Sequence, residues 1–76
     1  MMVLAELKKG ETAKVISIDN DKKIKERLNN IGLTEGVKVS LVRKAPFGDP
    51  IEIKVRDFYL ALRVTDAVKI QVKKYE

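Results

Sequence analysis

The sequence predicts a mainly β fold, in which one antiparallel sheet of five to six short strands curls into a small barrel and one inserted α-helix closes an open end. Two observations carry this prediction. Several stretches alternate apolar and polar residues with a period of two, and a single segment changes to helical spacing. At 76 residues the chain is too short for two packed sheets, so curling one sheet uses every inward side chain. We expect one domain over residues 1–76.

Four stretches alternate cleanly and are interpreted as strands, each with an apolar face toward the core and a polar face toward water. They comprise residues 37–41, 51–55, 58–63 and 68–73. This pattern assigns Phe58 and Val68 to the core. An earlier strand over residues 13–18 alternates less well, because Val15 and Ile16 are adjacent. That irregularity predicts either a bulge or a position that is covered on both faces.

One α-helix is expected over about residues 22–31, where the apolar residues fall at i, i+4 and i+7. These residues are Ile24, Leu28 and Ile31. The side chains of residues 19–21 offer oxygen acceptors to the first amides of the helix. At the other end, Gly32 stands where a left-handed residue is needed, and Leu28 and Leu33 are spaced to make the apolar contact of a Schellman motif.

Composition removes most enzyme and metal chemistry. The chain contains neither Cys nor His, which excludes disulfides, thiolate ligands, thiol nucleophiles and imidazole bases. Its four glycines are isolated turn residues and form no phosphate-binding loop. Asp19 and Asp21 flank Asn20, but the later Gly and Glu of a calcium loop are missing, so helix capping explains them more simply. We predict no catalytic residue, no intrinsic metal site and no cofactor.

The charge balance favours an acidic partner without identifying it. The chain has 16 Lys and Arg residues against 11 Asp and Glu residues, for a formal net charge of +5. A small basic barrel that binds RNA or another nucleic acid is therefore the alternative function. Against it, the lysines are interleaved with acids and the aromatic residues are few for a stacking surface. The apolar N-terminal segment is too short for a signal peptide, so we expect a cytoplasmic protein.

The chain resembles the FeoA family, the small cytosolic component of bacterial ferrous iron uptake. The resemblance covers essentially the whole chain, and its motifs occur in the family's order and spacing. They are GETAKV at residues 10–15, RLNNIGLTEG at 27–36, APFGDP at 45–50 and LALR at 60–63. It implies an SH3-like barrel and a role as accessory to FeoB, the membrane GTPase that moves Fe(II). The partner would then recruit the protein to the inner face of the cell membrane.

On this basis we expect function by protein contact, through a stiff loop over residues 45–50 and two arginines. The two prolines restrict the loop before binding, which lowers its ordering cost. Phe47 is the expected apolar anchor, and Arg27 and Arg63 are the expected partners of acidic or carbonyl groups. The full set is Arg27, Ala45, Pro46, Phe47, Gly48, Asp49, Pro50 and Arg63.

Each of these residues also has a purely structural interpretation. The loop can simply close a hairpin, and Phe47 can cap the barrel. Arg27 can be an ordinary charge on the helix surface. Arg63 can brace Asp49 or Asp66 within the fold.

Short strands with exposed edges also allow weak self-association of the protein.

Overall fold

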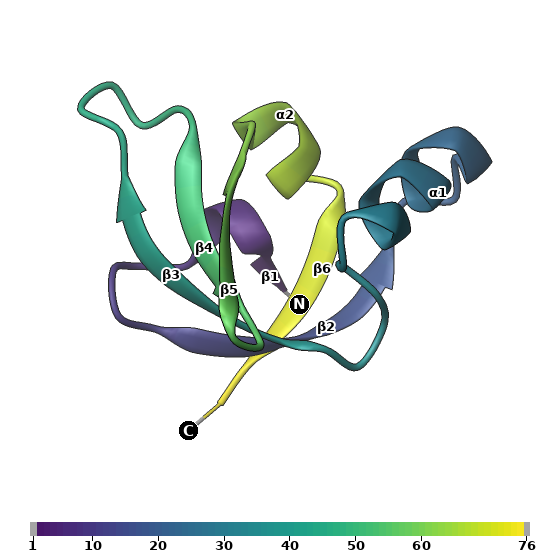
Figure 1. Ribbon diagram of the computed structural model, residues 1–76, viewed down its shortest axis with the longest axis horizontal. Coiled ribbons are helices and arrows are strands. Elements are labelled where there is room, and N and C mark those ends of the chain that lie inside the picture. The colour runs from purple at the N-terminus through teal and green to yellow at the C-terminus, as the bar shows by residue number, and fades with distance from the viewer. Residues whose placement is uncertain (1, 76) are drawn as a thin grey trace.

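The computed structural model describes residues 2–75 and has six strands in one antiparallel sheet, in the order β1-β6-β2-β3-β4-β5. The strands are β1 (Met2–Val3), β2 (Thr12–Ile18), β3 (Lys38–Lys44), β4 (Ile51–Val55), β5 (Phe58–Leu62) and β6 (Ile70–Lys74). The helices are the 3-10 helix η1 (Leu4–Glu6), α1 (Lys22–Asn30) and α2 (Val64–Ala67). The sheet curls round, and α2 lies over its upper opening, between the β3–β4 loop and α1 (Figure 1). The mainly β architecture predicted from the alternation is confirmed.

The core is entirely apolar. Among residues 2–75 no polar or charged side chain is buried. The largest fully buried side chains are Leu4, Leu7, Leu28, Leu33, Leu41, Ile51, Ile53 and Ile70. They come from η1, α1, the connecting segments and the inward faces of the strands, so one small core is shared by elements from the whole chain.

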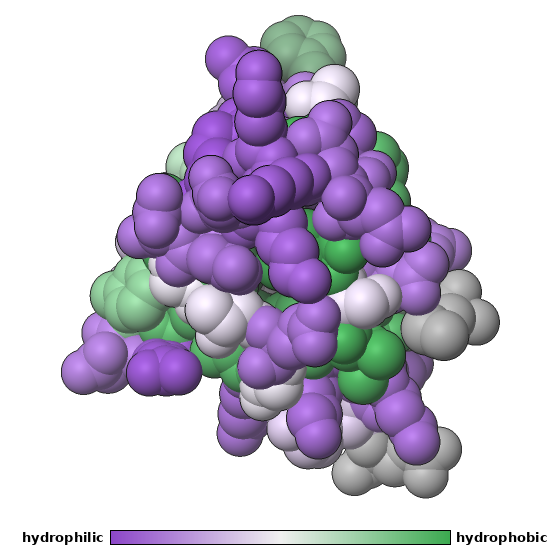
Figure 2. Space-filling model, turned by 90° about the vertical axis from the view of Figure 1, so that its right-hand side faces the viewer, coloured by the Kyte–Doolittle hydropathy of each residue, from purple (hydrophilic) through white to green (hydrophobic). Residues whose placement is uncertain are grey.

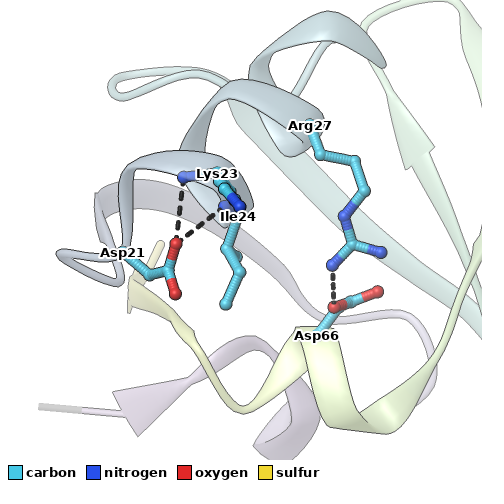
Figure 3. A network of polar contacts seen from close by, with 5 residues as sticks. All are labelled: Asp21, Lys23, Ile24, Arg27 and Asp66. Carbon is cyan, nitrogen blue, oxygen red and sulfur yellow. Dashed lines mark hydrogen bonds and ion pairs between the residues drawn. The ribbon is translucent and has the colours of Figure 1, made fainter.

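The start of α1 follows the predicted capping. Asp21 is the N-cap residue, and its Oδ1 accepts hydrogen bonds from the backbone N–H groups of Lys23 at 2.9 Å and Ile24 at 3.3 Å (Figure 3). Asp19 supports the cap, because its Oδ1 accepts a bond from the N–H of Asp21 at 2.9 Å. These carboxylates satisfy amides that have no partner within the helix.

The end of α1 is the predicted Schellman motif. The N–H of Leu33 donates to the carbonyl of Leu28, and the N–H of Gly32 donates to the carbonyl of Asn29, both at 3.0 Å. Gly32 has a φ of 101°, in the left-handed region that the motif requires. The end of the molecule that carries α1 is mainly hydrophilic, with small apolar patches between the polar side chains (Figure 2).

The irregular pattern in β2 is a β-bulge. The pairing of β2 with β6 changes register between Val15 and Ser17. The adjacent apolar pair is therefore accommodated by one extra residue in the strand, as one of the two predicted explanations requires. A second register shift lies between Leu41 and Arg43, where β3 pairs with β4. No irregularity in the sequence predicts it.

The assignment of Val68 to the last strand was wrong. Residues Val64–Ala67 form the helical turn α2, and Val68 is its C-cap, with a side chain that is 48% exposed. The backbone N–H of Val68 donates to the carbonyl of Val64 at 3.0 Å, which holds Val68 in the turn. β6 begins at Ile70, and its burial pattern then follows the predicted alternation.

Two further apolar residues were wrongly assigned to the buried face. Ile31 is 42% exposed, because it is the C-cap residue at which the chain leaves the helix. Phe58 is 38% exposed, because β5 is the last strand in the sheet order and has a neighbouring strand on one side only. The ring of Phe58 still lies close to the backbone of Gly32, which bears on the stability of this region.

Three lysines lie directly opposite one another on the outer face of the sheet. Lys14 of β2 is the register partner of Lys38 on β3 and of Lys73 on β6. Like charges at such positions destabilise a sheet, whereas opposite charges stabilise it. We expect Lys14→Glu to raise the free energy of unfolding by about 0.5–2 kcal/mol at low salt, as measured by urea denaturation.

The comparison for this substitution is Lys9→Glu, which changes the net charge equally at an exposed turn position. We expect it to alter stability by less than about 0.5 kcal/mol. The gain from Lys14→Glu should shrink as salt is added, since exposed charges are screened. Equal effects of the two substitutions would show that global charge, and not the cross-strand row, is responsible.

Candidate functional site

The short helix α2 connects the parts of the chain to which the candidate residues belong. On one side, the N–H of Val64 donates to Oδ1 of Asp49, in the β3–β4 loop, at 3.2 Å. On the other side, Asp66 accepts a hydrogen bond from Arg27 of α1 at 2.6 Å (Figure 3). Arg63 is the N-cap residue of α2 itself. The loop, α2 and α1 therefore lie along the same end of the barrel (Figure 1).

The loop over residues 45–50 is closed by its own backbone. The N–H of Ala45 donates to the carbonyl of Pro50 at 3.0 Å, and the N–H of Gly48 donates to the carbonyl of Ala45 at 2.7 Å. Phe47 lies at the tip with its side chain 99% exposed. The alternative that Phe47 caps the barrel is therefore wrong, and its ring adds nothing to the core.

A groove lies at the base of this loop. Its volume is about 570 Å³, and its lining residues are Arg43, Lys44, Ala45, Pro46, Pro50, Ile51, Glu52 and Ala61. The loop contributes Ala45 and both prolines, and β4 and β5 contribute Ile51 and Ala61. Arg43 and Glu52 form an ion pair in the same lining, with 2.8 Å between Nε and Oε1. An apolar groove edged by charge beside an exposed aromatic ring is typical of a protein-binding surface.

The two arginines differ in their surroundings. Arg27 is 57% exposed and pairs with Asp66, whose side chain is only 14% exposed, so this arginine also has a structural role. The side chain of Arg63 is exposed and forms no ion pair within residues 2–75. The interpretation that Arg63 braces Asp49 or Asp66 is thus wrong, because Asp49 accepts from a backbone amide and Asp66 is held by Arg27.

Apart from this surface, the described part of the chain offers little chemistry. Residues 2–75 contain no group of three His, Cys, Asp or Glu side chains that could hold a metal ion. The helices of this part are also too short or too polar to cross a membrane.

Among the described residues, one carboxyl group, that of Glu11, has a clearly shifted pKa. The pKa of Glu11 is lowered because its Oε2 accepts a hydrogen bond from Lys74 Nζ at 2.9 Å, and its Oε1 accepts one from the N–H of Lys8 at 2.7 Å. A carboxyl whose pKa falls on folding stabilises the fold above its ordinary pKa of 4.5. That contribution is lost as the pH falls through the lower, folded value.

We therefore expect Glu11→Gln to reduce stability by a constant amount at neutral pH, and the difference from the unmodified protein to shrink as the pH falls below the ordinary pKa. Urea denaturation at a series of pH values measures this difference. A gap that persists unchanged into strong acid would mean that the lost interaction is packing and not charge.

The sequence matches a family model described as the FeoA domain over residues 2–74. A curated relative from Porphyromonas gingivalis, the Fe(2+) transport protein A/Fe(2+) transporter FeoB fusion protein, is 31% identical over 72 residues. The match covers 95% of this chain and 8% of that protein, so the chain spans only a small part of the relative's length.

Two solved structures have the same fold. The FeoA protein from Chlorobium tepidum is 37% identical with a TM-score of 0.90, and the match covers 99% of this chain and 71% of that one. Stenotrophomonas maltophilia FeoA, solved with zinc and described as an SH3 domain protein, is 31% identical with a TM-score of 0.81, covering 96% and 91%. Because the family model matches nearly every residue and the barrel is shared, the chain belongs to the FeoA domain family and has its SH3-like fold.

Proposed function

We propose that the protein is a non-enzymatic accessory of bacterial ferrous iron uptake, which binds the cytoplasmic region of an FeoB-type membrane GTPase. The observation that carries the proposal is the relative whose name joins Fe(2+) transport protein A to the transporter FeoB in one polypeptide. Covalent linkage gives two binding partners a high effective concentration, so fusion is consistent with separate proteins that associate.

The surface we assign to this contact is the end of the barrel that carries the loop over residues 45–50, α2 and Arg27. The exposed ring of Phe47 supplies an apolar anchor, and the groove at the base of the loop accepts an apolar side chain of the partner. Because the loop is closed by its own hydrogen bonds, little conformational entropy is lost on docking. Arg63 is available for a carboxylate or carbonyl group of the partner.

Docking can influence transport only if the protein binds one state of the GTPase more tightly than the other. The expected consequence is a shift in the equilibrium between the two states of the GTPase, and hence in its nucleotide or transport cycle. The free energy of that shift equals the difference between the two binding free energies. This mechanism requires no reacting group on the protein. It also brings the protein to the inner face of the cell membrane.

The proposal predicts that Phe47→Ala weakens binding to a purified FeoB cytoplasmic region by about 10- to 100-fold, as expected for a central aromatic anchor. Isothermal titration calorimetry measures the dissociation constant. Stability should be unchanged, because the ring is fully exposed. The matched control is Tyr59→Ala, which removes another exposed aromatic ring from β5.

Arg63→Ala is the second variant, and it tests the charged part of the same surface. Undiminished binding by both Phe47→Ala and Arg63→Ala would exclude this end of the barrel as the contact. The nucleic-acid alternative predicts instead an affinity for RNA that falls steeply as salt rises, because bound counterions are released.

A further inference from the structure

The outer face of the sheet carries two rows of side chains that run across the strands. One row is the set of three opposed lysines, Lys73, Lys14 and Lys38. The next row joins Thr12, Ser40, Lys54 and Tyr59, which are register partners in turn from β2 to β5. Tyr75 extends this row, since its N–H donates to the carbonyl of Thr12 at 2.9 Å. We call the set Lys14, Lys38, Lys54, Lys73, Tyr59 and Tyr75 the basic face.

The positive charge of the basic face is not balanced within the described chain. None of its four lysines forms an ion pair with a residue between Met2 and Tyr75. Two acids close to this face in the sequence already have partners: Glu11 binds Lys74, and Glu52 binds Arg43. Lysines that face each other without acids between them repel one another, so this surface lacks the alternating charges of an ordinary solvated sheet.

Each tyrosine ring at the two ends of the basic face has one of the face's own lysines over it. Lys38 Nζ lies 5.8 Å from the ring centroid of Tyr75, and Lys54 Nζ lies 5.7 Å from that of Tyr59. Bases of a single-stranded nucleic acid stack on free aromatic faces, and these two exposed rings, each with a lysine over one face, give only a small stacking surface. Lysine is also a point charge without the planar fork by which arginine recognises fixed groups. The arrangement therefore fits a partner recognised by its charge density.

A shallow depression in the basic face suits a small anionic group. It is lined by Lys14, Lys73, Lys74 and Tyr75. Lys14 and Lys73 form no ion pair with a described residue and can donate to a phosphate ester, whereas Lys74 is already paired with Glu11. Tyrosine is favoured at the level of lipid headgroups.

We propose that the basic face binds an anionic membrane surface through lipid phosphate headgroups. Clusters of four or more lysines beside a bilayer are attracted by the negative surface potential of the cytoplasmic leaflet. The inference goes beyond the proposed docking function and needs no second protein, because the lipid surface itself is the partner. The two surfaces adjoin, since Lys54 of the basic face and Glu52 of the groove lie two residues apart on β4.

The test is sedimentation of the purified protein with vesicles. We expect binding to phosphatidylcholine vesicles that contain phosphatidylglycerol, no binding to pure phosphatidylcholine, and a loss of binding as salt rises. The double variant Lys14→Glu/Lys38→Glu should bind at least about tenfold more weakly. Its matched control is Lys22→Glu/Lys23→Glu, which has the same net charge but alters α1, and which should bind as the unmodified protein does.

The result that overturns the proposal is an absence of binding to anionic vesicles, or an equal loss in the two double variants. Single-stranded RNA forms a competing arm: if it displaces the protein from vesicles and binds more tightly through the same lysines, the face is a nucleic-acid site. Circular dichroism checks that each variant is folded. The double variant Lys14→Gln/Lys38→Gln, which removes the charges without reversing them, should lose vesicle binding to an intermediate extent. Because no transporter is present, these outcomes are independent of the Phe47 experiment.

Discussion

Leu28→Ala is expected to destabilise the protein by about 2–5 kcal/mol, as truncation of a large buried side chain does when the cavity cannot collapse. Leu28 is 1% exposed and is the buried side chain of α1, while Ile24 only partly covers the core. A domain of this length has a total stability of about 4–11 kcal/mol. The variant should therefore lie near its unfolding threshold, which urea denaturation followed by circular dichroism measures.

The control for Leu28→Ala lies on the same helix end. Ile31→Ala removes an apolar side chain of similar size, but that side chain is 42% exposed. We expect it to cost less than about 1 kcal/mol. If the two substitutions have similar effects, α1 contributes to stability through helix formation and not through the contact of Leu28 with the core.

Gly32→Ala is expected to cost about 2–3 kcal/mol, for two separable reasons. The φ of 101° is strained for a residue with a Cβ atom. In addition, a Cβ at this position would lie 2.7 Å from Cζ of Phe58, so the ring must move. Urea denaturation again measures the loss of stability. The substitution should also disrupt the contact between the end of α1 and the start of β5.

Gly36→Ala separates strain from contact. Gly36 has a φ of 88°, yet a Cβ there would meet no atom within 4 Å. We expect Gly36→Ala to lower the free energy of unfolding only by the cost of the strained backbone, about 1 kcal/mol. The difference in stability loss between Gly32→Ala and Gly36→Ala should fall when Phe58 is also changed to Ala. Equal losses at the two glycines would contradict a role for the Phe58 ring.

The ends of α1 were predictable from the sequence because they depend on neighbouring residues alone. Asp21 caps amides two and three residues ahead, and Gly32 and Leu33 close the helix onto carbonyls three and five residues back. Such bonds form wherever the local residue types allow them. The bulge in β2 was one of two explanations that the sequence offered, since two adjacent apolar residues cannot both point inward on a regular strand.

The helical turn α2 was not predictable in this way. It has four residues, too few for a helical pattern, and its N-cap residue Arg63 makes no side-chain cap. Distant residues hold it instead: Asp49, 15 positions earlier, accepts from the N–H of Val64, and Arg27, 39 positions before Asp66, pairs with that carboxylate. The sequence indicated the loop and both arginines as site residues. It did not show that they lie at the same end of the barrel, because α2, which contacts both the loop and α1, was not predicted.

The sequence by itself determined the β content, the one long helix with its caps, the loop over residues 45–50 and the family, because these follow from period, turn chemistry and motif order. Only the tertiary structure decided which side chains face one another. Lys14 lies opposite Lys73 and Lys38 because of the register of three strands, and that register shifts at a bulge within β2. Strand pairing joins residues that are far apart in the chain, so no local pattern encodes it. The basic face depends on that pairing.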